Sequence, residues 1–291
     1  LRREALAALG LPDLRFRREI EVDPTASCAL LDPEFSRMAV GRGTNGLEIS
    51  SLTDSHQSFM LRTHEDYSPV SGRWSHDGRY LGIRLHPKGT SSRAVVQIWD
   101  LHSRQQVRLF PATPFGAFAF DPSRPRILVD NGDASVTVWD LEKKESLGTH
   151  AIPGMIHHLE FSTDGRSFVV QHRVVRPWFT SIYNTDSGQV LQSRITAWVD
   201  SLSWDPLDRW VAAGARNGEV YLYDRKTEKS EMVGRLKNSV RSLVFTPDGQ
   251  FLFAGSEERE IILWDLRTRR RVMTIRLSGL QMGISRDGRH W

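Results

Sequence analysis

The 291-residue chain contains a single cysteine, Cys28. One thiol cannot form an internal disulfide or build a structural zinc site. Cys28 falls on a strand that we predict to be innermost in its sheet, where a buried, inert thiol is the simplest interpretation. One cysteine does not fix the compartment, because a domain outside the cytoplasm can also lack disulfides.

Long apolar runs are missing as well. No stretch reaches the roughly 18 consecutive apolar residues that a membrane-spanning helix requires. Hydrophobic residues make up 39% and charged residues 25% of the chain, the balance of a globular domain. The length fits one large domain or two ordinary ones.

Lysine is scarce although the chain is basic, with a formal net charge of +4 and a pI of about 9.4. The lysines are Lys88, Lys143, Lys144, Lys226, Lys229 and Lys237. The arginines that carry most of the charge are spread along the chain and interleaved with acids, whereas a nucleic-acid site needs them on one face. The distribution therefore favours a solvated surface over nucleic-acid binding.

Motifs for catalysis, cofactors and metals are also absent. The chain has no G-x-S-x-G elbow, no H-E-x-x-H pair and no Walker loop. GRGTNG at 41–46 has the G-x-G-x-x-G spacing, but the alternating LEISSL that follows indicates a strand where a dinucleotide loop requires a helix. We therefore predict no cofactor and interpret 41–46 as a turn.

The only adjacent histidines are His157 and His158. Neighbouring residues of a strand point to opposite faces of the sheet, so the two cannot easily share a metal. We interpret them as structural polar residues and predict no metal site and no catalytic residue.

Internal repeats dominate what the sequence does contain. Five segments align: VVQIWDLHSRQQV (95–107), SVTVWDLEKKESL (135–147), FTSIYNTDSGQVL (179–191), EVYLYDRKTEKSE (219–231) and EIILWDLRTRRRV (260–272). Successive aromatic positions in them are 40, 44, 40 and 41 residues apart. A period of this size indicates a repeat architecture.

A second shared piece lies upstream of each segment, as in RWSHDGRYLGI (73–83) and AFDPSRPRILV (119–129). It consists of a strand end, a turn rich in Asp, Pro and Gly, and a second apolar strand. The Trp-Asp pair then ends a third strand. We expect its indole to be buried between sheets with a partner for the N–H, and its carboxylate to accept N–H groups of the next turn. LLDPEFSRMAV (30–40) is a further copy, and MGISRDGRHW (282–291) begins another.

These features resemble the WD-repeat β-propeller family over about residues 26–291. The resemblance implies an all-β, seven-bladed propeller with four-stranded antiparallel blades, the last incomplete. The expected blades are 26–62, 67–110, 115–150, 155–193, 198–233, 238–276 and 280–291. The structural repeat residues are Trp99, Asp100, Trp139, Asp140, Trp264 and Asp265. No blade carries the family's Gly-His dipeptide, so its buried hydrogen-bond tetrad is incomplete.

The N-terminal residues fall outside the repeat. Residues 1–12 are rich in helix formers, and Gly10 and Pro12 stop the pattern, which predicts a helical linker. Residues 13–25 contain the alternating LRFRREIEV, our candidate for a ring-closing outer strand. REALAALGLPDLR (3–15) resembles the junction before the propeller of large bacterial proteins linked to serine/threonine kinases, which implies further domains in a parent chain.

Family members bind partners chiefly where the inner strands start and where the second strand turns into the third. The repeat alignment places Ser27, Val70, Gly116, His157, Asp200 and Arg241 at equivalent starts of inner strands. Arg176, Arg216 and Glu257 fall one residue before the family's loop acid. Trp198 precedes an inner strand and Trp178 lies in a turn, so each is either buried against the next blade or exposed to a partner, whereas Trp74, Trp204 and Trp210 fit the core.

We therefore expect a non-catalytic scaffold or sensor with a basic mouth for an acidic protein or peptide. The candidate residues are Arg241, Asp200, His157, Arg176, Arg216, Glu257, Trp198 and Trp178. Arginine and large aromatics are the residue types that most often dominate binding energy. The alternatives are a propeller hydrolase or lyase with its site in the channel, which needs convergent acids or histidines, and a nucleic-acid-binding propeller, which predicts steep salt dependence.

Overall fold

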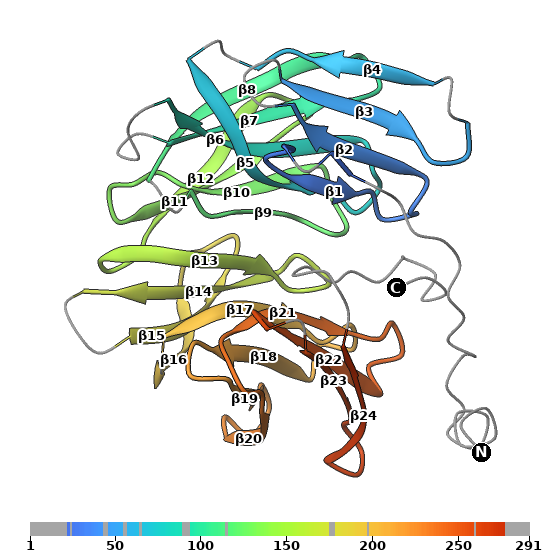
Figure 1. Cartoon of the computed structure of the whole chain (residues 1–291). Coiled ribbons are helices and arrows are strands. Elements are labelled where there is room, and N and C mark those ends of the chain that lie inside the picture. The colour runs from blue at the N-terminus through green and yellow to red at the C-terminus, as the bar shows by residue number, and fades with distance from the viewer. Residues whose placement is uncertain are drawn as a thin grey trace.

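A computed structural model describes residues 22–23, 25–42, 46–54, 57–63, 66–88, 94–113, 116–174, 178–196, 198–258 and 260–276. These residues form 24 strands and no helix (Figure 1). The all-β prediction is therefore confirmed for this part of the chain. The expected linker helix at 1–12, most of the expected closing strand at 13–25 and the expected seventh blade at 280–291 lie outside the described residues.

The strands form six four-stranded sheets, numbered here in chain order. Sheet 1 contains β1 (Ala29–Leu31), β2 (Arg37–Gly41), β3 (Leu47–Ser51) and β4 (Ser58–Leu61). Sheet 2 contains β5 (Tyr67–Trp74), β6 (Tyr80–Pro87), β7 (Ala94–Asp100) and β8 (Gln105–Ala112). Sheet 3 contains β9 (Phe118–Phe120), β10 (Arg126–Asp130), β11 (Ser135–Asp140) and β12 (Glu145–Ala151).

The other three sheets have the same organisation. Sheet 4 contains β13 (Met155–Phe161), β14 (Ser167–Arg173), β15 (Trp178–Asn184) and β16 (Val190–Thr196). Sheet 5 contains β17 (Val199–Trp204), β18 (Trp210–Ala215), β19 (Glu219–Asp224) and β20 (Ser230–Arg235). Sheet 6 contains β21 (Val240–Phe245), β22 (Phe251–Ser256), β23 (Glu260–Asp265) and β24 (Arg270–Arg276).

Every sheet is an antiparallel meander in which each strand pairs with the next one in the chain. The first strands of successive sheets contact one another in chain order, from β1 and β5 to β17 and β21. The first strand of each sheet is therefore the inner one, and the fourth is the outer edge. This arrangement is consistent with a β-propeller.

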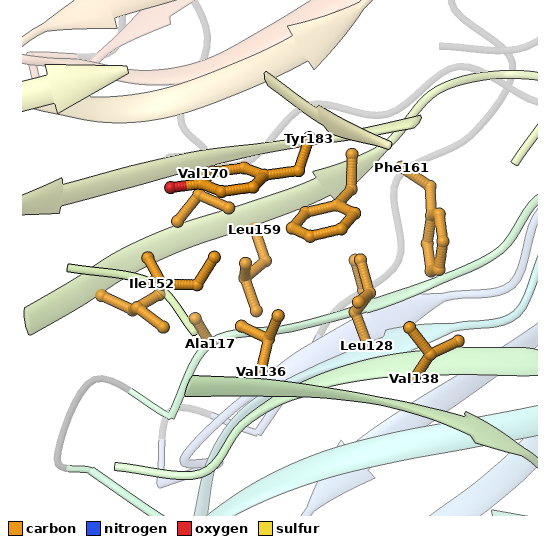
Figure 2. Packing of buried hydrophobic residues seen from close by; sticks show 12 residues of the cluster. Ala117, Leu128, Val136, Val138, Ile152, Leu159, Phe161, Val170 and Tyr183 are labelled. Carbon is orange, nitrogen blue, oxygen red and sulfur yellow. The ribbon is translucent and has the colours of Figure 1, made fainter. Parts of the chain in front are cut away.

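Third-strand aromatic residues join each sheet to the preceding one. Trp99 of sheet 2 packs with Leu30 and Ile49 of sheet 1. Tyr183 of sheet 4 packs with Leu128 and Val138 of sheet 3, and Figure 2 shows the side chains of the two sheets facing each other across this core. Because four short strands cannot cover both faces of one sheet, neighbouring sheets bury each other's apolar faces.

The Trp-Asp pairs confirm the expected hydrogen bonds of the carboxylate but not the expected hydrogen bond of every indole. Asp140 Oδ1 accepts the backbone N–H groups of Glu142 (3.0 Å) and Lys143 (2.8 Å) in the turn that follows, and Asp100 and Asp265 make the corresponding bonds. The buried Nε1 atoms of Trp99 and Trp139, by contrast, have no hydrogen-bond partner among the described residues. The expectation that the indole N–H has a hydrogen-bond partner is therefore wrong for Trp99 and Trp139, in a chain whose hydrogen-bond tetrad is incomplete.

The turns between first and second strands alternate between two types. Sheets 1, 3 and 5 have an Asp-Pro turn followed by an arginine, and sheets 2, 4 and 6 have a Ser/Thr-x-Asp-Gly turn. In sheet 3, Arg126 pairs with Asp121 (2.6 Å) and donates to the carbonyl of Gly165 in the turn of sheet 4 (3.0 Å). Arg37 reaches Gly78 and Arg209 reaches Gly249 in the same way. We call this contact the arginine clamp.

The glycine of the clamp is required both for its backbone conformation and for its lack of a side chain. Gly165 has a φ of +68°, and a Cβ added there would lie 2.4 Å from Asp121 Oδ2. Only glycine adopts this backbone conformation without cost and leaves room for the ion pair. The clamps thus connect sheets 1–2, 3–4 and 5–6 by a charge-assisted contact in which the aspartate is buried each time and the arginine is buried only in sheet 3.

Candidate functional site

Four inner strands carry a β-bulge near their start. The register shifts at Val70 in β5, His157 in β13, Asp200 in β17 and Arg241 in β21. These are four of the six residues that the repeat alignment makes equivalent. A bulge adds one residue to a strand and redirects its side chain, so it brings side chains from several sheets to one rim. We call the rim formed by these bulges and the neighbouring second-to-third strand turns the channel mouth.

An aromatic cluster lies at the channel mouth between sheets 4 and 5. The rings of Trp178 and Trp198 are stacked, with centroids 5.2 Å apart and planes 24° from parallel. His157 meets both edge-on, at 5.6 Å from Trp178 and 5.5 Å from Trp198. The indole Nε1 of Trp198 donates to Nε2 of His157 over 3.3 Å.

Two arginines extend this stack at both ends. The guanidinium of Arg173 lies 4.8 Å from the ring centre of Trp178, and that of Arg216 lies 4.4 Å from the ring centre of Trp198. These are cation–π distances. Both tryptophans are half-buried, so neither alternative from the sequence holds fully: each ring packs within the cluster and part of it remains accessible. We call Arg173, Trp178, Trp198 and Arg216 the stacked ladder.

A charge network lies at the mouth between sheets 5 and 6. Asp200 accepts a hydrogen bond from Ser239 Oγ (2.6 Å) and pairs with Arg241 (3.3 Å). Arg241 also pairs with Glu257 (2.9 Å), and its side chain is 40% exposed. These bonds hold Arg241 in place and partly neutralise it.

The mouth opens into a cavity of about 550 Å³. Its charged and imidazole lining consists of Arg73, Arg84, His157, His158, Asp200, Arg241 and Glu257. Arg73 donates to Glu160 on β13. Both adjacent histidines are lining residues of this one cavity, and their expected orientation to opposite faces of the sheet stays a prediction. The bulge at His157 interrupts the alternation on which that expectation rests.

Burial favours the neutral form of both histidines. Burial lowers the pKa of His157 below its ordinary value of 6.5; Asp200 acts in the opposite direction, and Arg216, Arg84 and Arg173 lower it further. Burial lowers the pKa of His158 as well, with smaller contributions from Arg73 and His157. The positive charges of several sheets therefore converge on His157.

Seven of the eight partner-site candidates lie in these two clusters. They are His157, Trp178, Trp198, Asp200, Arg216, Arg241 and Glu257. Arg176 lies outside the described residues. No group of three or more His, Cys, Asp or Glu side chains suited to a metal ion occurs in the described ranges.

Three arginines of the site were missed by sequence reasoning. Arg84, Arg73 and Arg173 lie within or at the end of strands and match no repeat position of the mouth. Arg84 had a usable signal, because it is a lone cation inside the apolar strand YLGIRL, where burial of a charge requires a reason.

Comparison with known proteins supports the repeat assignment. Residues 187–224 and 229–265 match the family model described as WD domain, G-beta repeat. Each match starts with the outer strand of one sheet and ends with the third strand of the next, so both matched repeats span two sheets. No curated protein matches the chain significantly. No helix in the described ranges has the length and apolar character of a membrane span. The two matched repeats, together with the six four-stranded sheets, support placing the chain in a WD-repeat family.

Proposed function

We propose that the chain is a non-catalytic binding module whose channel mouth holds an acidic segment of a protein partner. WD-repeat domains are generally non-catalytic scaffolds that bind proteins. The observation that carries the proposal is the stacked ladder: two arginines and two half-buried tryptophans lie side by side at the mouth. Their residue types are the ones that most often dominate binding energy at interfaces.

The charge balance selects an acidic partner. Arg73, Arg84, Arg173, Arg216 and Arg241 lie at the mouth or line its cavity, against the carboxylates of Glu160, Asp200 and Glu257. The excess positive charge attracts anionic segments and orients them during encounter. Indole faces beside it supply apolar area, so an acidic segment with interspersed apolar side chains fits best.

An enzyme is the less supported alternative. The equivalent starts of inner strands carry one carboxylate, Asp200, and it is engaged with Ser239 and Arg241. General acid–base chemistry needs a positioned titratable group within hydrogen-bond reach of the reacting atoms, whereas this carboxylate is already engaged within the protein. The histidines of the cavity, whose pKa values burial lowers, fit a structural and electrostatic role better.

The wider setting of this module is part of the same proposal. Residues 280–291 would begin a seventh blade and residues 13–25 would supply its outer strand, which gives a seven-bladed ring. The likeness of residues 3–15 to a kinase-linked junction supports a place in a larger bacterial signalling protein, where the propeller acts as sensor or scaffold.

Fluorescence anisotropy tests the function. A labelled peptide of alternating glutamate and leucine is expected to bind the wild-type chain, and one of alternating lysine and leucine is not. An Arg173→Glu/Arg216→Glu variant is expected to weaken binding of the acidic peptide at least about tenfold, or about 1.4 kcal/mol. Arg267→Glu/Arg270→Glu is the matched control, because it changes the charge equally at exposed residues beside the outer edge of sheet 6.

Equal losses in the two variants would show non-specific attraction and contradict the assignment to the mouth. A single-stranded or duplex oligonucleotide tested in parallel addresses the nucleic-acid alternative. Tighter binding of the oligonucleotide, with an affinity that falls steeply with salt, would favour that alternative.

A further inference from the structure

The stacked ladder is held in a fixed order by the backbone of sheets 4 and 5. Arg173 lies directly opposite Trp178 in the pairing of β14 with β15. The backbone N–H of Arg216 donates to the carbonyl of Trp198 over 2.9 Å. Each arginine is therefore placed beside its own tryptophan, and the stacked indoles join the two pairs across the boundary between the sheets. A surface ordered in this way loses little freedom when a partner binds.

The two guanidiniums of the ladder can each receive a carboxylate. Stacking on an indole uses the flat face of a guanidinium and leaves the N–H donors at its edge. Arg216 is exposed and Arg173 is half-buried. In the part of the chain that the structure describes, no carboxylate pairs with either of them, whereas Arg241 is engaged by Asp200 and Glu257. The edge of each guanidinium matches the two oxygens of a carboxylate.

The length of the ladder sets the spacing of the carboxylates. The indoles of Trp178 and Trp198 stack on each other, so the guanidiniums lie beyond them with both rings in between. The successive distances along the ladder are 4.8, 5.2 and 4.4 Å. Laid end to end, they slightly exceed the span of four residues of an extended strand, about 13 Å, and are about twice the span of two. Acidic residues four positions apart therefore reach both arginines.

The indoles determine what lies between the two acids. In an extended segment, residues i, i+2 and i+4 point to the same side. When residues i and i+4 meet Arg173 and Arg216, residue i+2 points at the half-buried rings of Trp178 and Trp198. An apolar side chain at this position gains contact with the accessible parts of the rings, whereas a charged one is desolvated there.

We propose that the stacked ladder recognises an extended segment with the pattern acidic–x–apolar–x–acidic. The outer carboxylates pair with Arg173 and Arg216, and the central side chain packs on the two indoles. A helical segment does not fit, because residues four apart in a helix are separated by only about 6 Å along its axis. The inference deepens the proposed function and rests on it, since it takes an acidic segment at the channel mouth as the partner.

Three labelled peptides of identical composition and charge test the pattern by fluorescence anisotropy on the whole 291-residue chain. Their cores are Glu-Ser-Leu-Ser-Glu, Ser-Glu-Leu-Glu-Ser and Glu-Leu-Ser-Ser-Glu, between the same glycine-serine flanks. The second core brings the acids two positions apart, and the third turns the leucine to the opposite side. The first is expected to bind at least about fivefold more tightly than each of the others.

A double-mutant cycle tests the contact of one carboxylate with Arg216. Arg216→Gln and replacement of a terminal glutamate of the first core by glutamine are expected to weaken binding by less together than the product of their separate effects, by a factor of at least about three. Arg267→Gln is the matched control, because Arg267 is exposed in the third-to-fourth strand turn of sheet 6 and should show no such coupling. Equal coupling for the two arginines overturns the pairing.

Failure of the pattern and failure of the proposed function are distinguishable. Equal binding of the three cores, or tighter binding of the second or third, overturns the pattern. The function then still stands if Arg173→Glu/Arg216→Glu weakens all three. Absence of binding by every core and by the alternating glutamate-leucine peptide overturns both. The comparison of cores uses the wild-type chain, so it does not depend on the folding of any variant.

Discussion

The indole N–H of Trp198 donates to Nε2 of His157 across the boundary between sheets 4 and 5. An accepting Nε2 must hold a lone pair, so this imidazole is neutral, in agreement with its lowered pKa. One hydrogen bond thus ties the protonation state of the channel mouth to the geometry of the stacked ladder.

Acidification is expected to loosen the ladder. When pH falls below 6.5 and reaches the lowered pKa of His157, Nε2 becomes a donor and the bond from Trp198 is lost. Tryptophan emission of the wild-type chain should change with an apparent pKa below 6.5. In His157→Gln, whose amide oxygen accepts from Trp198 without titrating, this transition should vanish. The same transition in the variant would assign it to another group.

The arginine clamp is expected to be a large contribution to stability. Arg126→Met leaves the carboxylate of Asp121 buried without its partner, and the two side chains are 8% and 0% exposed. Breaking such a pair on one side costs about 3–5 kcal/mol. Urea unfolding followed by circular dichroism measures this cost, with Arg124→Met as the control of equal chemistry. A cost below about 1 kcal/mol would show that the clamp is only an accessory contact.

Gly165→Ala tests the receiving side of the same clamp. A Cβ would press on Asp121 in a backbone conformation with φ of +68°, so both strain and the disturbed ion pair lower stability. We expect a loss of more than about 1 kcal/mol. Gly148→Ala is the control, because the nearest atom to its added Cβ lies at 3.7 Å. Equal effects in the two variants would contradict the role of Gly165.

Buried histidines predict a fall in stability under mild acid. His172 is buried between the carbonyl of Pro153 and the hydroxyl of Ser181, and burial lowers its pKa, as it does for His158. The unfolded chain takes up these protons near pH 6.5 and the folded chain only at lower pH. The free energy of unfolding therefore is at its full value above pH 6.5 and decreases as pH falls below it.

Urea midpoints as a function of pH check this. His172→Gln should reduce the slope below pH 6.5, because one of the titrating groups is removed, whereas His102→Gln at an exposed turn should not. Stability that is unchanged or rises on mild acidification would contradict the burial of neutral histidines.

The two substitutions of Trp198 should differ in their cost to peptide binding. Trp198→Phe keeps an aromatic face for Arg216 but loses the N–H, and Trp198→Ala loses both. Binding of an acidic peptide should therefore fall by about 1–2 kcal/mol or more in the alanine variant and by less in the phenylalanine variant. Anisotropy with the peptide measures both. Equal binding by all three proteins would remove Trp198 from the site.

The repeat in the sequence was sufficient to predict strands, turns and the equivalence of His157, Asp200 and Arg241. The bulges place these three residues on one rim, so residues that are equivalent in the repeat also lie at equivalent places in the structure. The bulge at His157 interrupts the alternation on which the expectation for His157 and His158 rests, because strict alternation holds only in regular strands. A bulge depends on backbone pairing that residue types alone do not specify.

Contacts between sheets could not be predicted from one repeat. Arg84 enters the cavity only because Gly116 of the following sheet leaves space, and Arg126 needs the carbonyl of Gly165. The two pairs of residues lie 32 and 39 positions apart in the chain. Arg84 is conspicuous as a lone cation in an apolar strand, but nothing in the local sequence identifies the residue that it packs against. Stacking of Trp178 on Trp198 likewise depends on how sheets 4 and 5 approach each other.

The central claim, that the channel mouth is the partner-binding face, is tested most directly by photo-crosslinking in lysate of the source organism. A photoreactive benzoylphenylalanine replaces Val174 beside the mouth, or Leu207 in the turn at the other end of the inner strands, residues of similar exposure at 62% and 55%. A crosslinked partner that excess acidic peptide prevents is expected from position 174, and none is expected from position 207. A partner crosslinked at position 207 and not at 174 would contradict the central claim.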